Sequence, residues 1–462
     1  MSARVARFFR FEERGTNART EVRAGVTTFL TMAYILFVNP IILSLGTPDG
    51  PGVPATAAAA GTALAAGLVC ILMGLVSNFP LALASGMGLN AFLAYTVVAA
   101  QGVSWQTGMG LVVLDGAIVL LLVLVGVRGW VFQAIPMDLK RAIAGGLGLF
   151  LATLGLVGAR IIVIPKSSAD LVAAAGDPLH VVPVPPPVQA GPVCTWGVLL
   201  VLAGLVTMTV LHQRGFQGAI LAGIAVVTVL DIGRDLITGD PASPIWNLKL
   251  GAPDLSAIGQ ADVRGALSLQ LLPLLLGLIV VDFFDTLGTM TAIGEQAGLT
   301  DEKGQVENGT RVLAVDAMGA VIGGLCGASS VTSYVESASG VGDGGRTGLM
   351  PIVTGVLFLA SIVLAPLFGL VPAEATAPAL IFVGFLMLRG LRSMEWNDVT
   401  IAVPAFVTLI AMPLTYSISH GIGYGFISYV LIGIVAGRWR QIHPMMYVVA
   451  ALFALSFIFV LE

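Results

Sequence analysis

Two carboxylates lie three residues apart in the stretch Val280-Val-Asp-Phe-Phe-Asp-Thr-Leu-Gly-Thr289, within a run that is otherwise uncharged from residue 266 to residue 294. That run is long enough to cross a bilayer, because a spanning helix needs about 20 apolar residues. Ionisable side chains inside such a span are costly and usually mark a substrate or ion pathway. The stretch therefore predicts a protein that moves a polar solute through a membrane.

The composition of the whole chain supports a lipid environment. Of its 462 residues, 57% are hydrophobic and 10% are charged, and the mean hydropathy is +0.96, whereas soluble domains average roughly 25% charged residues. The three cysteines are scattered and the four histidines are dispersed, so we expect no disulfide framework, no metal site and no cofactor. We also expect the lipid bilayer as a partner, no nucleic-acid binding, and no enzymatic activity, since no nucleophile-base pair or cofactor fingerprint is present.

Apolar segments of spanning length recur along the whole sequence. We predict an all-α polytopic membrane protein with 14 transmembrane segments, and a further apolar run at 443–460 that is either a fifteenth span or an interfacial helix. The segments at 88–101 and 333–345 are short. The predicted spans are 22–46, 55–77, 88–101, 107–127, 140–158, 194–212, 215–233, 267–297, 310–327, 333–345, 347–369, 376–391, 399–417 and 420–437.

The basic residues predict the orientation in the membrane. Six arginines lie within the first 23 residues, and the apolar run that follows is long and has no Ala-x-Ala cleavage signal. We interpret 1–21 as a cytoplasmic N-terminus followed by an anchored helix. Alternating loops then place eleven further Lys and Arg residues on the same side and leave five of the 22 on the other, as the positive-inside rule requires. The prediction is a multi-pass protein of a bacterial inner (plasma) membrane.

The two halves of the sequence resemble each other. Each contains one short, glycine-rich segment, Ala84-Ser-Gly-Met-Gly-Leu-Asn90 in the first half and Glu336-Ser-Ala-Ser-Gly-Val-Gly342 in the second. Seven spans per half is an odd number, so the second half is inverted relative to the first. Short, glycine-interrupted segments at corresponding positions of inverted repeats indicate broken third and tenth spans that meet at a binding site near the midplane.

Several blocks of this sequence resemble one family of transporters. They are Gly15-Thr-Asn-Ala-Arg-Thr-Glu21, Ala24-Gly-Val-Thr-Thr-Phe-Leu-Thr-Met-Ala-Tyr-Ile-Leu-Phe-Val-Asn-Pro40, Gly86-Met-Gly-Leu-Asn-Ala-Phe92, Asp282-Phe-Phe-Asp-Thr-Leu-Gly-Thr289, Glu336-Ser-Ala-Ser-Gly340 and Gly344-Gly-Arg-Thr-Gly348. The chain resembles the AzgA-like purine permeases of the nucleobase-ascorbate transporter superfamily over nearly its full length.

That resemblance implies proton-coupled uptake of guanine, hypoxanthine or adenine, by an elevator or rocking mechanism in which a core domain moves against a gate domain. It also implies a homodimer that forms through the gate domain. The implied segments are the N-terminus 1–21, core spans 22–127, gate spans 139–237, core spans 266–370, gate spans 374–437 and a C-terminal apolar segment 441–462.

The resemblance also implies substrate residues in the third, eighth and tenth spans, which fall here on Asn90, Asp282 and Glu336. A purine is flat and rimmed by donors and acceptors, so carboxylates and an amide suit its edge. For each residue a structural role stays open: a helix cap for Asn90, a carboxylate satisfied by hydroxyls or helix-terminal N–H groups for Asp282, and a protonated acid bonded to backbone for Glu336. Glu336 could also carry the coupled proton.

Three more residues are weaker candidates. Asp285 either supports Asp282 or binds the proton, because residues three apart share a helix face. Phe283 could stack on the substrate and Thr28 could close the site, although packing is the favoured interpretation of both.

Asp115 and Asp316 are expected to bond backbone or neighbouring hydroxyls. An anion carrier of the sulfate or bicarbonate type remains the alternative function, disfavoured because acids line the predicted site.

Overall fold

The computed structural model describes residues 3–45, 51–126, 136–163, 189–192, 194–239, 252–300, 306–364, 370–415 and 417–460. These residues are mainly helical, which confirms the predicted all-α class. The helices are α1 Ala3–Phe8, α2 Ala18–Met32, α3 Ile35–Leu43, α4 Ala55–Val76, α5 Met87–Ala91, the π-helix η1 Phe92–Ala100, α6 Trp105–Val125, α8 Met137–Gly158, α10 Trp196–Gln213, α11 Ala219–Thr238, α12 Val263–Ala266, η2 Leu269–Leu271, α13 Leu272–Ala297, α14 Gly309–Leu325, α15 Ser337–Gly342, α16 Leu349–Ser361, α17 Ala373–Met387, η4 Leu388–Ser393, α18 Val399–Thr415, α19 Ile418–Val435, η5 Trp439–Gln441 and α20 Pro444–Val460.

Six of the described helical segments are at least 18 residues long and apolar enough to cross a membrane, and five further apolar helices are shorter. The prediction of 14 spans therefore stays a prediction. The first expected span differs in detail, because it begins at Ala18 and its helix is interrupted between Met32 and Ile35. The run at 443–460 forms the single helix α20, which packs against α19.

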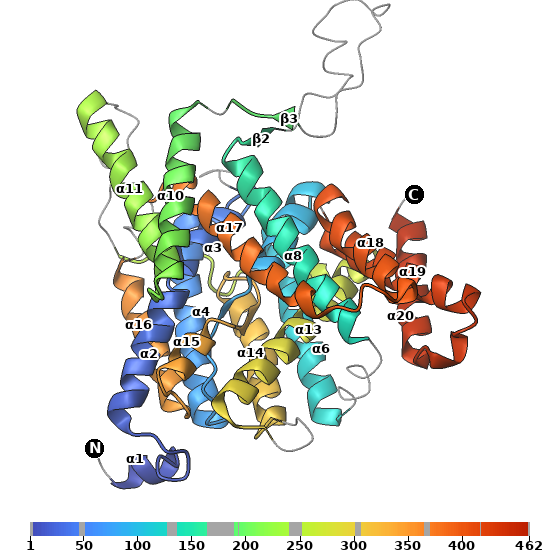
Figure 1. The fold of residues 1–462 in the computed structure, drawn as a ribbon, viewed down its shortest axis with the longest axis horizontal. Helices are drawn as coiled ribbons and strands as arrows, with labels where there is room; N and C mark the ends of the chain where they lie inside the picture. Colours follow the sequence, from blue (N-terminus) through green and yellow to red (C-terminus); the bar gives the residue numbers. More distant parts are fainter. Residues whose placement is uncertain are drawn as a thin grey trace, which may run out of the picture.

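The long helices form two packed groups. In the first group α4 packs against α16 and α14, α6 packs against α14, and α2 packs against α16; in the second, α8 packs against α17 and α18, α10 against α11, and α18 against α19. Figure 1 shows α18, α19 and α20 together at one side and α10 with α11 at the other. Small residues allow the close packing: a Cβ built at Gly348 of the first group would lie 2.1 Å from the carbonyl oxygen of Gly74. Such contacts between small residues are typical of helices that pack in lipid.

Two short strands join the two halves of the chain at the centre of the first group. β1 (Leu83–Ser85) pairs antiparallel with β4 (Val331–Ser333), with Ala84 opposite Thr332. Each strand leads into a short helix, α5 or α15. We expected interrupted helices at these two positions, and the structure shows three-residue strands followed by helices of five and six residues. The second pair of strands, β2 (Ile162–Val163) and β3 (Gln189–Ala190), lies outside this centre.

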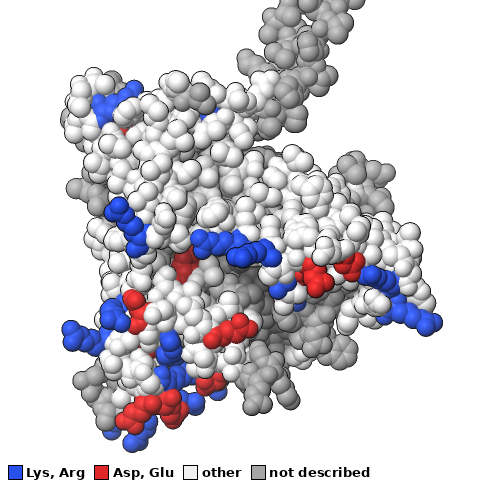
Figure 2. All heavy atoms as spheres, in the orientation of Figure 1, with Lys and Arg blue, Asp and Glu red and all other residues white. Residues whose placement is uncertain are grey.

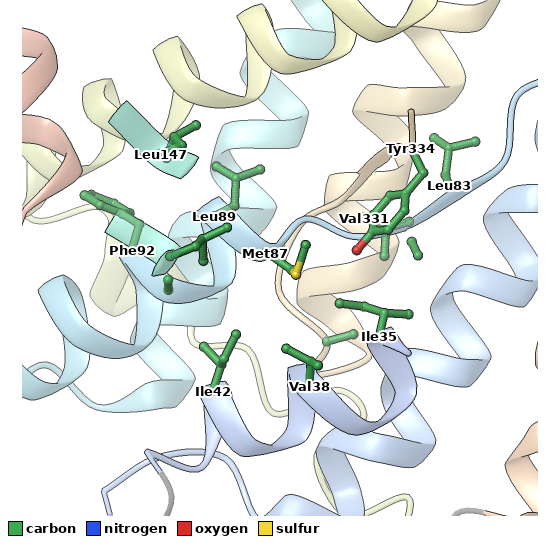
Figure 3. Close-up of a cluster of buried hydrophobic side chains, with 14 of the residues drawn as sticks. Ile35, Val38, Ile42, Leu83, Met87, Leu89, Phe92, Leu147, Val331 and Tyr334 are labelled. Atoms are coloured by element: carbon green, nitrogen blue, oxygen red, sulfur yellow. The ribbon is translucent and has the colours of Figure 1, made fainter. Parts of the chain in front are cut away.

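Buried apolar side chains surround the crossing strands. Figure 3 shows Leu83 and Val331 beside Tyr334, with Ile35 and Val38 of α3 packed below them. Leu83 and Val331 are fully buried. The strands are therefore fixed from both sides, and the residues that follow them have defined positions.

Charged side chains gather on one part of the surface. In Figure 2 most blue and red spheres lie in the lower part of the view, around α1 and below α8, while much of the upper part is white. The exposed side chains of the long helices are largely apolar, as Leu121, Leu199 and Val206 illustrate. This distribution suits a protein surrounded by lipid.

Candidate functional site

Three of the predicted site residues lie on neighbouring elements at the crossing strands. Asn90 lies on α5, Asp282 on α13, and Glu336 directly before α15. α13 contacts α5, α15 and β4. The strand pair therefore brings together segments that are about 200 and 50 residues apart in the sequence.

Asn90 is buried inside α5 and is not the cap of that helix. The N-terminal flanking residue of α5 is Gly86, which makes no side-chain cap, so the alternative of a helix cap for Asn90 is wrong. The side chain is 0% exposed, and among the described residues neither its Oδ1 nor its Nδ2 has a hydrogen-bond partner. Buried amides in native proteins are usually satisfied, and an unsatisfied group costs about 1–3 kcal/mol. Asn90 therefore has both a donor and an acceptor available for a ligand.

Glu336 is held by a hydrogen bond from the first helix group. The hydroxyl of Tyr34 donates to Glu336 Oε1 at 2.7 Å. Tyr34 is 0% exposed and lies at the interruption between α2 and α3, so its position is fixed by packing. Glu336 keeps part of its surface accessible although protein surrounds it. The hydroxyl of Tyr34 thus orients one oxygen of this carboxylate.

Asp282 is almost fully buried and contacts the segment that leads into β4. Its Oδ1 accepts a hydrogen bond of 3.1 Å from the Ser330 hydroxyl. The backbone carbonyl of Asp282 lies 3.1 Å from the hydroxyl oxygen of Thr286, one turn later on α13. A hydroxyl donor to Asp282 was one of the expected structural roles, and the structure shows that this bond ties α13 to the crossing strands.

The other predicted site residues are Thr28, Phe283 and Asp285. The Thr28 hydroxyl donates to the carbonyl of Ala24 in its own helix at 2.9 Å, and a Cβ built at Gly340 of α15 would lie 2.1 Å from the Thr28 hydroxyl. Thr28 therefore packs where α2 touches α15. The side chains of Phe283 and Asp285 lie outside the part of the chain that the structure describes. Among the described residues, no three His, Cys, Asp or Glu side chains come together to hold a metal ion.

Two residues of this site were not predicted as site residues from the sequence. Tyr34 was part of a quoted block but received no role, and Ser330 was not singled out. A tyrosine inside an apolar span is a usable signal, because its hydroxyl needs a partner when it is buried. For Ser330 the sequence offers no comparable signal, since serines are frequent in glycine-rich segments.

Comparisons with known proteins find one family model and several full-length relatives that match nearly the whole chain. A family model described as "Permease family" (Xan_ur_permease) matches residues 19–424. The adenine permease AdeQ of Escherichia coli is 42% identical over 99% of this chain and 97% of its own length. The guanine/hypoxanthine permease PbuG of Bacillus subtilis is 40% identical over 98% of this chain and 99% of its own length.

Solved structures share the fold at much lower identity. The transmembrane domain of a cyanobacterial bicarbonate transporter, BicA, has a TM-score of 0.60 and 16% identity, and the match covers 88% of this chain and 97% of that one. The murine anion transporter Slc26a9 has a TM-score of 0.61 and 11% identity, over 91% of this chain and 69% of that one. At these identities the likeness shows the fold alone, a 7+7 inverted repeat of transmembrane helices, and does not favour an anion as the cargo.

The long match to the family model and the relatives at about 40% identity together settle the class of protein. The resemblance seen in the sequence is confirmed, and the chain is a multi-pass membrane transporter rather than an enzyme. It belongs to the permease family, alongside the adenine and guanine/hypoxanthine permeases.

Proposed function

We propose that this permease takes up purine nucleobases. The observation that carries the proposal is the buried amide of Asn90, which has no partner among the described residues and lies on α5. The helix α13, which carries Asp282, contacts both α5 and the helix α15 that follows Glu336. An amide can donate to a ring nitrogen or carbonyl and accept from an N–H, while a carboxylate accepts from a ring N–H. An uncharged, flat molecule with alternating donors and acceptors at its edge suits these groups better than an anion, which carboxylates repel.

The names of the relatives support the same class of substrate. Guanine and hypoxanthine are our first candidates, with adenine as the next. The adenine permeases AdeQ and AdeP are 42% and 40% identical to this chain and the guanine/hypoxanthine permease PbuG is 40% identical, so overall identity does not rank the purines. The substrate assay must therefore include all three.

In this proposal, Asn90, Asp282 and Glu336 bind the purine edge, Phe283 stacks on it, and Thr28 holds α15 against α2. Glu336 and Asp285 are the groups that couple transport to protons. A carboxylate that binds substrate better in one protonation state links the two fluxes, because linkage is reciprocal.

In this proposal, transport results from movement of a core domain relative to a gate domain. The core comprises 22–127 and 266–370 and carries the substrate residues; the gate comprises 139–237 and 374–437. The core moves against the gate by an elevator or rocking motion, the N-terminus is cytoplasmic, and two copies associate through their gates. In this proposal the moving contact includes Leu147 of α8, which lies near Leu89 of α5 and Phe92 of η1 (Figure 3).

The test is uptake of radiolabelled hypoxanthine, guanine and adenine into cells that lack their own purine carriers. We expect uptake that a protonophore abolishes and that unlabelled purines, but not uracil or sulfate, compete away. Asp282→Asn and Glu336→Gln should each abolish accumulation while the protein remains in the membrane. The matched control is Glu395→Gln, which removes an exposed carboxylate elsewhere. Near-normal uptake in both site variants would overturn the assignment of the site, and the lack of any purine-competed uptake would overturn the substrate class.

A further inference from the structure

A second pair of carboxylates lies in the first helix group, on helices that carry none of the proposed substrate residues. Asp115 is in the middle of α6 and Asp316 is in α14; they are 0% and 1% exposed. The helices approach closely at this level, because a Cβ built at Gly116 would lie 2.7 Å from the carbonyl oxygen of Ala317. Gly116 directly follows Asp115 and Ala317 directly follows Asp316, so the two acids lie on closely packed turns of α6 and α14.

Asp316 is surrounded by hydrogen-bond donors. Its Oδ2 accepts from the Thr286 hydroxyl at 2.5 Å, and its Oδ1 accepts from the Ser333 backbone N–H at 3.0 Å and the Ser333 hydroxyl at 2.7 Å. Hydrogen bonds to the charged form favour that form. Asp316 therefore suits a negative charge, and it links α14 to both α13 and β4.

Asp115, unlike Asp316, receives no hydrogen bonds within the described part of the chain. Among the residues that the structure describes, neither of its oxygens has a hydrogen-bond partner. α14, α12, α13 and η1 pack against α6, and their described parts bring no buried Lys or Arg to this site. Besides Asp316, the titratable groups on those elements with described side chains are Asp282, Tyr95, and the exposed Asp262, Arg264, Glu295 and Arg311.

Two negative charges side by side in a low-dielectric interior cannot both persist, and one carboxyl of such a pair keeps a proton. The donors around Asp316 keep the negative charge there. We propose that Asp115 is a proton-binding site, and that the pair carries one negative charge, on Asp316, which holds α13 and β4 in place. This proton is separate from the one proposed to travel with the substrate.

The site has a consequence for the substrate residues. β4 leads through Tyr334 directly to Glu336, and Thr286 lies one turn after Asp282 on α13. Ionisation of Asp115 would place a second charge beside Asp316 and displace both segments. Raising the pH should therefore disturb purine binding through Asp115, without any change in the groups that touch the purine.

The direct test is infrared spectroscopy of the purified full-length protein at neutral pH, which detects the C=O stretch of a protonated carboxyl group and its shift in D₂O. We expect Asp115→Asn to lose one such band and Glu395→Gln to retain it. Asp115→Asn copies the shape of the neutral acid, so it should fold and keep its affinity for purine to a higher pH than the wild type. Neither infrared result depends on the identity of the substrate, so the proposal can fail or hold independently of the proposed function.

A second variant guards against a failure of Asp115→Asn to fold. Asp115→Leu is also neutral and of similar size, and it should give folded protein if Asp115 is uncharged. Failure of both variants to fold would mean that the charge is needed, which would overturn the proposal. An unchanged carboxyl band in Asp115→Asn, or an equal alkaline loss of purine binding in the variant and the wild type, would overturn it as well.

Discussion

The hydrogen bond from Tyr34 to Glu336 makes a sharp prediction. Tyr34→Phe removes one hydroxyl and leaves a fully buried ring in place. The lost bond is 2.7 Å long and reaches a carboxylate, and bonds to charged groups contribute about 1.5–3 kcal/mol. Because Glu336 is partly accessible, water can replace part of that contribution, so the lower end applies. A difference of 1.4 kcal/mol is about tenfold in affinity.

We therefore expect the Kd for purine to rise about tenfold in Tyr34→Phe. The reason is that the carboxylate of Glu336 loses its fixed orientation and must be ordered when the substrate binds. The measurement is equilibrium binding of radiolabelled purine to purified protein, at constant pH.

The matched control is Tyr447→Phe. It makes the same chemical change at a tyrosine whose hydroxyl donates to the Trp439 carbonyl at 2.8 Å, away from the site. This variant should bind purine as the wild type does. If Tyr34→Phe is folded and its Kd stays within twofold of the wild type, the reasoning that Tyr34 orients Glu336 is refuted.

Three further perturbations have defined outcomes. Asp316→Asn puts an NH₂ group or a neutral oxygen among several donors, so purine binding and thermal stability should both fall, checked by binding and by the melting midpoint in detergent. Gly348→Ala brings a methyl group to 2.1 Å from a backbone carbonyl of α4; overpacking of this kind costs about 1–3 kcal/mol and should lower the melting midpoint. Hydrogen bonds from Thr400 and Arg438 lower the pKa of Asp398 below its ordinary value of 3.8. The ionised Asp398 therefore stabilises the folded protein above pH 3.8, and this stabilisation is lost as the pH falls below that value. Asp398→Asn should remove this part of the acid dependence of unfolding.

Controls separate these effects from general damage. Gly390→Ala adds a methyl group where no atom lies within 4 Å, so its melting midpoint should match the wild type. If Gly348→Ala has the same melting midpoint as Gly390→Ala, that result would contradict the close contact of α4 and α16. Unchanged binding in Asp316→Asn would contradict the role of Asp316 in holding β4, and an acid unfolding curve that Asp398→Asn leaves unaltered would contradict the pKa argument.

Much of the fold could be predicted because lipid imposes strong local rules. Apolar runs of spanning length predicted α4, α6 and α8 to within a few residues, since backbone groups in a bilayer must bond within their own segment. The interruption of the first helix was not predicted, because Ala33 and Tyr34 lie in an unbroken apolar sequence. The strands β1 and β4 were not predicted either, because three residues are too few to show a period.

The candidate site could be predicted only in part. Acids inside apolar runs are rare, so Asp282 was visible from its apolar surroundings, whereas the family resemblance was needed to assign Asn90 and Glu336. The donors that orient them were not visible, because Tyr34 and Ser330 are separated from their partners by 302 and 48 residues in the sequence. Asp115 was expected to bond backbone or hydroxyls, and the structure differs, because the donors on α13 and β4 bond Asp316 and neither oxygen of Asp115 has a partner among the described residues.

The sequence by itself determined the membrane environment, the bounds of most helices, the family and the identity of the buried acids. These properties follow from local composition and from blocks of adjacent residues. Only the tertiary structure decided which groups meet: β1 with β4, Tyr34 with Glu336, and the turn of α6 that carries Asp115 with the turn of α14 that carries Asp316. The physical reason is that each meeting depends on how helices from opposite halves of the chain pack, and close packing between small residues leaves no periodic trace in the sequence.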